Sequence, residues 1–285
     1  MNKNLKIFLS VVFFFAVAFF AAKSCWNVEV KVTPRKTAVK TAVKKKTPPK
    51  KKITVPRESA AVPPAGAAKM AIILDDWGLN LALLKDAEDI GRPLTLSVLP
   101  NLTHSSEIAE EAAGRGLGVM LHMPMQPKNR RQPLEPRTLL TTTPDKDILE
   151  YLNNALESVP QAEGVNNHQG SAATSDERVM RTVLGHLKKK KLFFIDSQVI
   201  STSVGARVAA ELGLPFTKRD VFLDNTPTVE AVQEKLRSAQ KIALARGRVV
   251  VIGHDKKATL EAIRLMVPEL EKNGVRLVLA KDLLE

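Results

Sequence analysis

The chain has 285 residues, of which 44% are hydrophobic, and its formal net charge is +13 at pH 7. Apolar residues are frequent enough for a sizeable core, and the single cysteine, Cys25, excludes an intramolecular disulfide. The charge is unevenly distributed, because residues 1–69 carry 15 Lys/Arg and 2 Asp/Glu, whereas residues 70–285 carry 28 of each. The larger part of the chain is therefore neutral, which argues against a nucleic-acid-binding domain there.

The N-terminus has the pattern of an export signal. Lys3 and Lys6 precede an apolar run from Ile7 to Ala22, which predicts a signal anchor or a signal peptide over residues 1–26. The weak cleavage pattern Ala22-Lys23-Ser24 favours an uncleaved anchor, and both alternatives stay open. We expect the rest of the chain to face the periplasm or the cell exterior. Lysines after the apolar run would favour the opposite orientation under the positive-inside rule, so the charges alone leave the orientation open.

Residues 27–68 are rich in Lys, Pro, Val, Thr and Ala. Because like charges repel and prolines stiffen a chain, this composition predicts a disordered, extended linker. Two interpretations remain for the linker. It is either a solvated spacer, or a basic segment that contacts anionic lipid or acidic wall polymer.

From residue 69 to residue 285, short apolar runs alternate with amphipathic stretches, which predicts one domain. Strands are expected at 70–74, 94–99, 118–121, 192–195, 248–252 and 275–279, with weaker ones at 162–166 and 215–217. Helices are expected at 105–115, 176–189, 204–211, 229–246 and 259–272. Repeated strand–helix alternation predicts an α/β fold with a parallel sheet. Seven or eight units in this length fit a (β/α) barrel better than an open sheet.

Acidic and histidine side chains stand at the ends of several predicted strands. These residues are Asp75, Asp76, His122, Asp196 and His254, and His168 lies in a polar loop after the weak strand at 162–166. Because the carboxyl ends of parallel strands converge on one face, the side chains can meet there. Asp75 and Asp76 can both reach such a site only if the chain turns, and Gly78 would allow that turn.

One Asp and two His form a common open zinc set, which leaves a position for water and lowers its pKa to about 7. A second carboxylate can then accept a proton, and a further His can protonate a leaving amine. The alternative is that each residue has a local structural role. The Asp pair can cap the next helix, and each His can be a hydrogen-bonded residue at a strand end or in a loop.

Five separated blocks of the sequence resemble the divergent branch of the polysaccharide deacetylase superfamily. The blocks are Ile73–Gly78, Gly118–Pro127, Gly164–Gly170, Phe194–Ser197, and Val251–His254 with the later Gly274–Leu277. The resemblance implies a distorted (β/α)7–8 barrel and hydrolysis of acetyl groups on cell-surface sugars. It also implies that Asp76 and His122 are metal ligands, Asp75 is the general base and His254 is the general acid.

The sequence departs from the ordinary family pattern at one position. Gln126 stands where that pattern has a second His, four residues after the first. His168, from the next block, is a candidate for the missing ligand. Two hypotheses follow. The first is a hydrolase that uses a divalent metal, expected to be zinc, to deacetylate a cell-envelope polysaccharide. The second is a catalytically degenerate, membrane-tethered glycan-binding or scaffolding protein.

Overall fold

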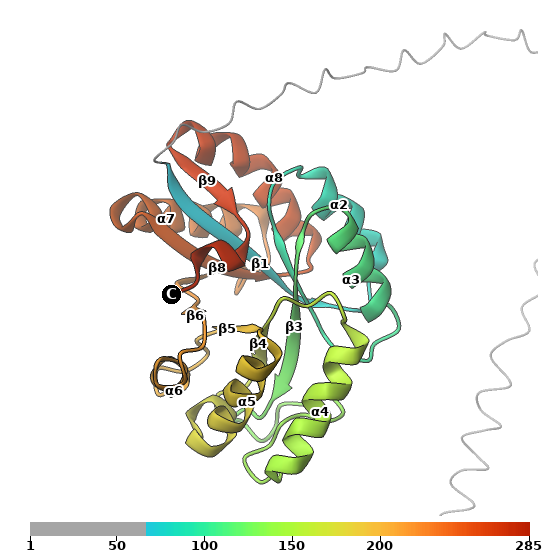
Figure 1. Ribbon diagram of the computed structural model, residues 1–285. Helices are drawn as coiled ribbons and strands as arrows, with labels where there is room; N and C mark the ends of the chain where they lie inside the picture. Colours follow the sequence, from blue (N-terminus) through green and yellow to red (C-terminus); the bar gives the residue numbers. More distant parts are fainter. Residues whose placement is uncertain (1–66) are drawn as a thin grey trace, which may run out of the picture. The chain divides into compact units, whose positions relative to one another are not determined.

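The described part of the chain is a nine-stranded parallel sheet with helices between all successive strands except β6 and β7 (Figure 1). The computed structural model describes residues 67–285. The strands are β1 (Ala68–Trp77), β2 (Thr95–Val98), β3 (Gly118–Met125), β4 (Gly164–Gln169), β5 (Phe193–Asp196), β6 (Phe216–Lys218), β7 (Val221–Phe222), β8 (Arg248–His254) and β9 (Val275–Val278). The helices are α2 (Leu84–Asp89), α3 (Ser105–Gly114), α4 (Asp145–Ser158), α5 (Glu177–Lys190), α6 (Gly205–Leu212), α7 (Val229–Arg246) and α8 (Lys257–Lys272).

The strand order is β6-β5-β4-β3-β2-β1-β8-β7, and β9 pairs with the first half of β1. No ladder joins β6 to β7 among the described residues, but the chain itself connects these two edges. The amide of Arg219 donates to Asp196 in β5 at 2.9 Å, and the next amide, of Asp220, donates to Val250 in β8 at 2.8 Å. The α/β class and the parallel sheet are thus confirmed. The sheet is a half-barrel, whereas the sequence predicted a distorted (β/α)7–8 barrel.

Side chains alternate between two faces of this sheet, as the pleat of a strand requires. The larger apolar cluster contains Met70, Ile72 and Leu74 together with residues of the surrounding helices. The smaller cluster lies on the opposite face and contains Ala71, Ile73, Met120, Val250 and Ile252. Continuing each row by two residues leads from Ile73 to Asp75, from Met120 to His122 and from Ile252 to His254. The candidate site residues Asp75, His122 and His254 therefore lie on the interior face of the half-barrel, beyond its apolar cluster.

The five predicted helices form, within two residues of their expected bounds. The structure adds the short helix α2, and α4, whose buried residues Ile148, Leu152 and Ala155 repeat at helical spacing. Within residues 67–285 no helix is both long and apolar enough to cross a membrane. The predicted signal anchor at 1–26 and almost all of the predicted linker at 27–68 lie outside the described residues.

Candidate metal centre

Both aspartates after Leu74 reach the site because β1 contains an irregularity there. Between Leu74 and Trp77, β1 contains one residue more than β2, whose paired residues are Leu96 and Val98. Asp76 has a φ of 68°, in the left-handed region that non-glycine residues rarely adopt. The turn predicted to depend on Gly78 thus begins two residues earlier, at Asp76 itself. This local strain brings a second carboxylate onto the interior face.

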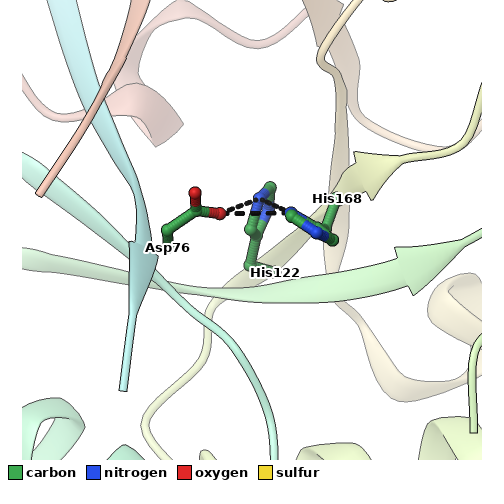
Figure 2. A group of neighbouring side chains, drawn as sticks. All are labelled: Asp76, His122 and His168. Atoms are coloured by element: carbon green, nitrogen blue, oxygen red, sulfur yellow. Dashed lines mark hydrogen bonds and ion pairs between the residues drawn. The ribbon is translucent and has the colours of Figure 1, made fainter. Parts of the chain in front are cut away.

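Asp76, His122 and His168 direct one side-chain atom each toward a common point (Figure 2). Oδ1 of Asp76 lies 3.3 Å from Nε2 of His122 and 3.1 Å from Nδ1 of His168. The two imidazole nitrogens lie 3.2 Å apart. The sequence indicated that His168 lies in a loop, but the structure places it in β4. The three strands β1, β3 and β4 therefore each contribute one donor.

Asn166 determines which nitrogen of His122 faces this point. Its Nδ2 donates to Oδ1 of Asp75 at 2.8 Å, so its Oδ1 accepts from Nδ1 of His122 at 2.8 Å and from the hydroxyl of Ser97. With Nδ1 carrying the hydrogen, Nε2 of His122 has a free lone pair. Asn166 is fully buried, and it also links the two candidate groups Asp75 and His122.

Glu135 orients His168 by contacting its Nε2, so that its Nδ1 faces the common point. Its Oε1 lies 3.1 Å from Nε2 of His168, which leaves Nδ1 facing Asp76 and His122. Carboxylates that hold the distal nitrogen of a histidine in this manner are a common support for metal ligands. Glu135 comes from the segment between β3 and α4, where the sequence predicted no functional residue.

The donor set fits a divalent cation. Metal–ligand bonds of about 2.0–2.2 Å at angles between tetrahedral and octahedral separate ligand atoms by about 3.0–3.5 Å, and the three observed separations are 3.1, 3.2 and 3.3 Å. Oδ1 of Asp76 is buried and accepts no hydrogen bond of normal geometry from any residue within 67–285. Burial acts to raise the pKa of Asp76, but His122 and His168 outweigh it and hold that pKa well below its usual range. A charged carboxylate oxygen without a hydrogen-bond donor is what a cation would satisfy.

Asp75 lies beside this donor set with a different environment. It is 3% exposed, and its Oδ2 is 3.6 Å from Nε2 of His122. Burial raises the pKa of Asp75 above its ordinary value, against the opposing effects of His122 and the hydrogen bond from Asn166. A carboxyl group whose pKa is shifted toward neutrality is a more effective base at neutral pH than an ordinary aspartate.

His254 approaches from β8 and is held by Asp224. Oδ1 of Asp224 lies 2.8 Å from Nδ1 of His254, while Nε2 of His254 lies 3.6 Å from Oδ2 of Asp76. Burial acts to lower the pKa of His254, but the hydrogen bond and charge of Asp224 outweigh it and raise that pKa. Asp224 in turn accepts from the backbone of His254 and from Thr259, at 2.9 and 2.8 Å. Nε2 of His254 is thus available to give a proton at the site.

Two sequence positions prove to have structural roles. Gln126 accepts from the amide and hydroxyl of Thr141 at 2.6 and 3.0 Å, so it holds the segment that carries Glu135. Asp196 accepts from the amide of Gln198 and the hydroxyl of Ser203 at 2.7 and 2.5 Å, and so shapes the turn after β5.

The structure brings the five predicted residues Asp75, Asp76, His122, His168 and His254 together, whereas their individual roles remain predictions.

Comparison with known proteins identifies the family of this chain. A family model described as divergent polysaccharide deacetylase matches residues 72–284. The chain belongs to the divergent polysaccharide deacetylase family, which confirms the resemblance seen in the sequence. Its relatives include the protein YibQ of Escherichia coli (strain K12), 33% identical over 221 residues, which cover 78% of this chain and 69% of YibQ.

A Haemophilus influenzae protein is 32% identical over 199 residues, covering 69% of this chain and 70% of that protein. Among solved structures, the protein ATU2773 from Agrobacterium tumefaciens C58 has a TM-score of 0.73 at 22% identity. The match covers 77% of this chain and 90% of ATU2773. This similarity shows that the two proteins share a fold.

Proposed function

We propose that this protein is a metal-dependent hydrolase that removes acetyl groups from a cell-envelope polysaccharide. The observation that carries the proposal is the convergence of Asp76, His122 and His168 beside Asp75 and His254. Asn166 and Glu135 orient the two imidazoles of this set. Membership of the divergent polysaccharide deacetylase family supports the substrate class. One carboxylate and two imidazoles form the type of set that binds catalytic zinc.

The residues divide the proton transfers between them. A divalent cation held by Asp76, His122 and His168 would supply a Lewis acid for the acetyl carbonyl and lower the pKa of a water molecule. Asp75 accepts the proton of the attacking water, because its carboxylate lies beside the three donors and has a raised pKa. His254 donates a proton from Nε2 to the leaving amine, because Asp224 orients the imidazole and favours its protonated form by raising its pKa.

The location of this activity is also a proposal. The apolar run from Ile7 to Ala22 would anchor the chain in the cell membrane. The basic segment at 27–68 would then place residues 69–285 at the envelope glycan, in the periplasm or outside the cell. This arrangement fits an insoluble polysaccharide substrate, since a tether keeps the enzyme close to it.

The test of the proposed reaction is acetate release from N-acetylated oligosaccharides by the full-length chain. We expect release that stops after chelation and returns with added zinc. The competing hypothesis is a degenerate glycan-binding protein, which the Gln126 position favours, because the ordinary family ligand is missing there. Oligosaccharide binding without any acetate release, at full zinc occupancy, would favour that hypothesis over hydrolysis.

The support that Glu135 gives to His168 predicts a measurable loss of metal affinity. Glu135→Gln removes the negative charge 3.1 Å from Nε2 of His168 while keeping the side-chain size. We expect zinc affinity to fall about 10–100-fold, measured by competition with a chelating dye. Glu107→Gln is the matched control, because Glu107 also contacts a histidine, His104, at 2.9 Å but outside the cluster. Equal affinities in the two variants would show that Glu135 does not support the site.

A further inference from the structure

A cavity of 340 Å³ lies beside the proposed metal site. Glu135 lines this cavity, and the same carboxylate contacts His168. The cavity therefore adjoins the three converging donors through a single side chain. Its volume is within the usual range for small-ligand pockets, about 300–1,000 Å³.

The walls of the cavity have the mixed character that carbohydrate binding requires. Leu99, Leu102 and Pro136 present apolar surfaces, onto which the C–H face of a sugar ring can pack. Asn101 and Asn154 contribute amides, and Nδ2 of Asn101 donates to Oδ1 of Asn154 at 3.0 Å. The other amide groups, Oδ1 of Asn101 and Nδ2 of Asn154, form no hydrogen bond with a residue in the described range. They can therefore bind hydroxyl groups of a ligand.

Arg137 is the only cationic side chain that lines this cavity within residues 67–285. Its guanidinium carbon lies 5.8 Å from the centre of the Tyr151 ring, and the side chain makes no ion pair or hydrogen bond with a described residue. Other arginines of the domain differ in this respect. Nine of the fourteen arginines in the described range form ion pairs with carboxylates, and Arg219 donates to two backbone carbonyls.

The arginines without such partners are not spread evenly. Three of the remaining four, Arg130, Arg131 and Arg137, belong to the segment between β3 and α4 that also carries Glu135. Lys128, in the same segment, also has no ion pair to any residue in 67–285. The carboxylate of the segment, Glu135, contacts His168 and none of these cations. The segment that carries Glu135 and Arg137 therefore has an excess of positive charge, although residues 70–285 as a whole are neutral. Of its cations, Arg137 is the one that lines the cavity.

The backbone holds Arg137 in a conformation that costs energy. Its φ is 59°, and the turn that includes it is closed by Thr138, whose amide and hydroxyl both donate to the carbonyl of Glu135, at 3.3 and 2.7 Å. Left-handed conformations of non-glycine residues are concentrated at functional sites, where the surrounding structure maintains them. The same turn thus fixes Glu135 against His168 and Arg137 at the cavity.

We infer that the cavity is a substrate subsite for an anionic sugar, one whose carboxylate or phosphate group binds the guanidinium of Arg137. Arginine suits this role because its planar group binds both anions through two parallel hydrogen bonds. The inference rests on the proposed function and narrows it. The substrate is an acetylated glycan in which the sugar next to the reacting one carries a negative charge, and Arg137 determines this specificity.

The test compares three tetrasaccharides of N-acetylated hexosamine as substrates of the full-length, zinc-loaded chain. One is neutral, one carries carboxylate groups on alternate sugars, and one carries phosphate groups at the same positions. We expect one of the anionic substrates to have the highest kcat/KM, which identifies the anion. Arg137→Gln should then reduce kcat/KM for that substrate about tenfold, mainly through KM, because a hydrogen-bonded charge pair is lost. The neutral substrate should change less than twofold.

Arg276→Gln is the matched control, since Arg276 also has no ion pair to a described residue. It lies in β9, beside the amino-terminal half of β1 and away from the site. This variant should leave all three substrates unchanged. Equal kcat/KM for neutral and anionic substrates in the wild type would overturn the inference while the proposed function stood. A preference for the anion that survives Arg137→Gln would overturn it as well.

If the wild type released acetate from none of the three, the proposed function would fail separately, and calorimetric binding of the same tetrasaccharides would decide the inference. Tighter binding of an anionic tetrasaccharide that is lost in Arg137→Gln would support the subsite. Equal binding of the three, or no binding, would overturn it.

Discussion

Asp75→Asn is expected to reduce kcat by about 10²–10⁴-fold while leaving the zinc content unchanged, because it removes the proton acceptor but no metal ligand. The substitution preserves the shape of the side chain. It also preserves an oxygen that can accept from Nδ2 of Asn166, which now lies 2.8 Å from Oδ1 of Asp75. The loss should therefore appear in turnover, measured as acetate release at saturating substrate, and not in folding.

A second buried aspartate provides the control for this variant. Asp196 is 1% exposed and also ends a strand, but its carboxylate accepts from Gln198 and Ser203. Asp196→Asn should therefore leave kcat within about tenfold of the wild type. If Asp75→Asn kept wild-type turnover at full zinc occupancy, the assignment of Asp75 as the base would be wrong.

Asp224→Asn is expected to reduce turnover and to move the alkaline limb of the pH–rate profile to lower pH. His254 must carry a proton to donate it, so activity is lost as the pH rises through the pKa of His254. The hydrogen bond and charge of Asp224 raise that pKa, and their removal should lower it. The alkaline limb of Asp224→Asn should therefore lie at a lower pH than that of the wild type, measured as kcat against pH at full zinc occupancy.

Thr259→Val separates this electrostatic effect from a loss of structure. It removes the hydrogen bond of 2.8 Å from the Thr259 hydroxyl to Oδ2 of Asp224 but keeps the charge of Asp224. We expect its alkaline limb to stay at or above the wild-type pH. If Asp224→Asn lowered kcat with no movement of the limb, Asp224 would act only by holding His254 in place.

The sequence allowed the fold class and the main candidate residues to be predicted, because strands buried on both faces are continuous apolar runs. Such a run ends visibly where Asp75 or His254 begins a polar segment, whereas His122 is a single polar residue within an apolar strand. The alternation of the pleat then places these side chains on the interior face, in line with Ile73, Met120 and Ile252. Apolar runs do not show whether the sheet forms a full barrel or a half-barrel. That depends on whether β6 and β7, at the two ends of the strand order, pair with each other.

The supporting residues were harder to find, for reasons that differ from case to case. Asp224 follows β7, a strand of two residues that is too short to show a pattern. Glu135 lies in a segment without periodicity, and only the folded chain brings it to His168. β4 was placed too early because Asn166, Asn167 and His168 are polar although they belong to a strand. Helix α4, which was not among the expected helices, does have a signal in the sequence, namely the helical spacing of Ile148, Leu152 and Ala155 after Pro144.

The zinc content of the purified protein shows whether Asp76, His122 and His168 form a metal site. The measurement is zinc per chain in the purified full-length protein after incubation with zinc and removal of the excess, for the wild type and His168→Ala. We expect close to one zinc per wild-type chain and a loss of most of it in the variant, which lacks one of the three proposed ligands. No zinc in the wild type, or equal zinc in both proteins, would contradict it.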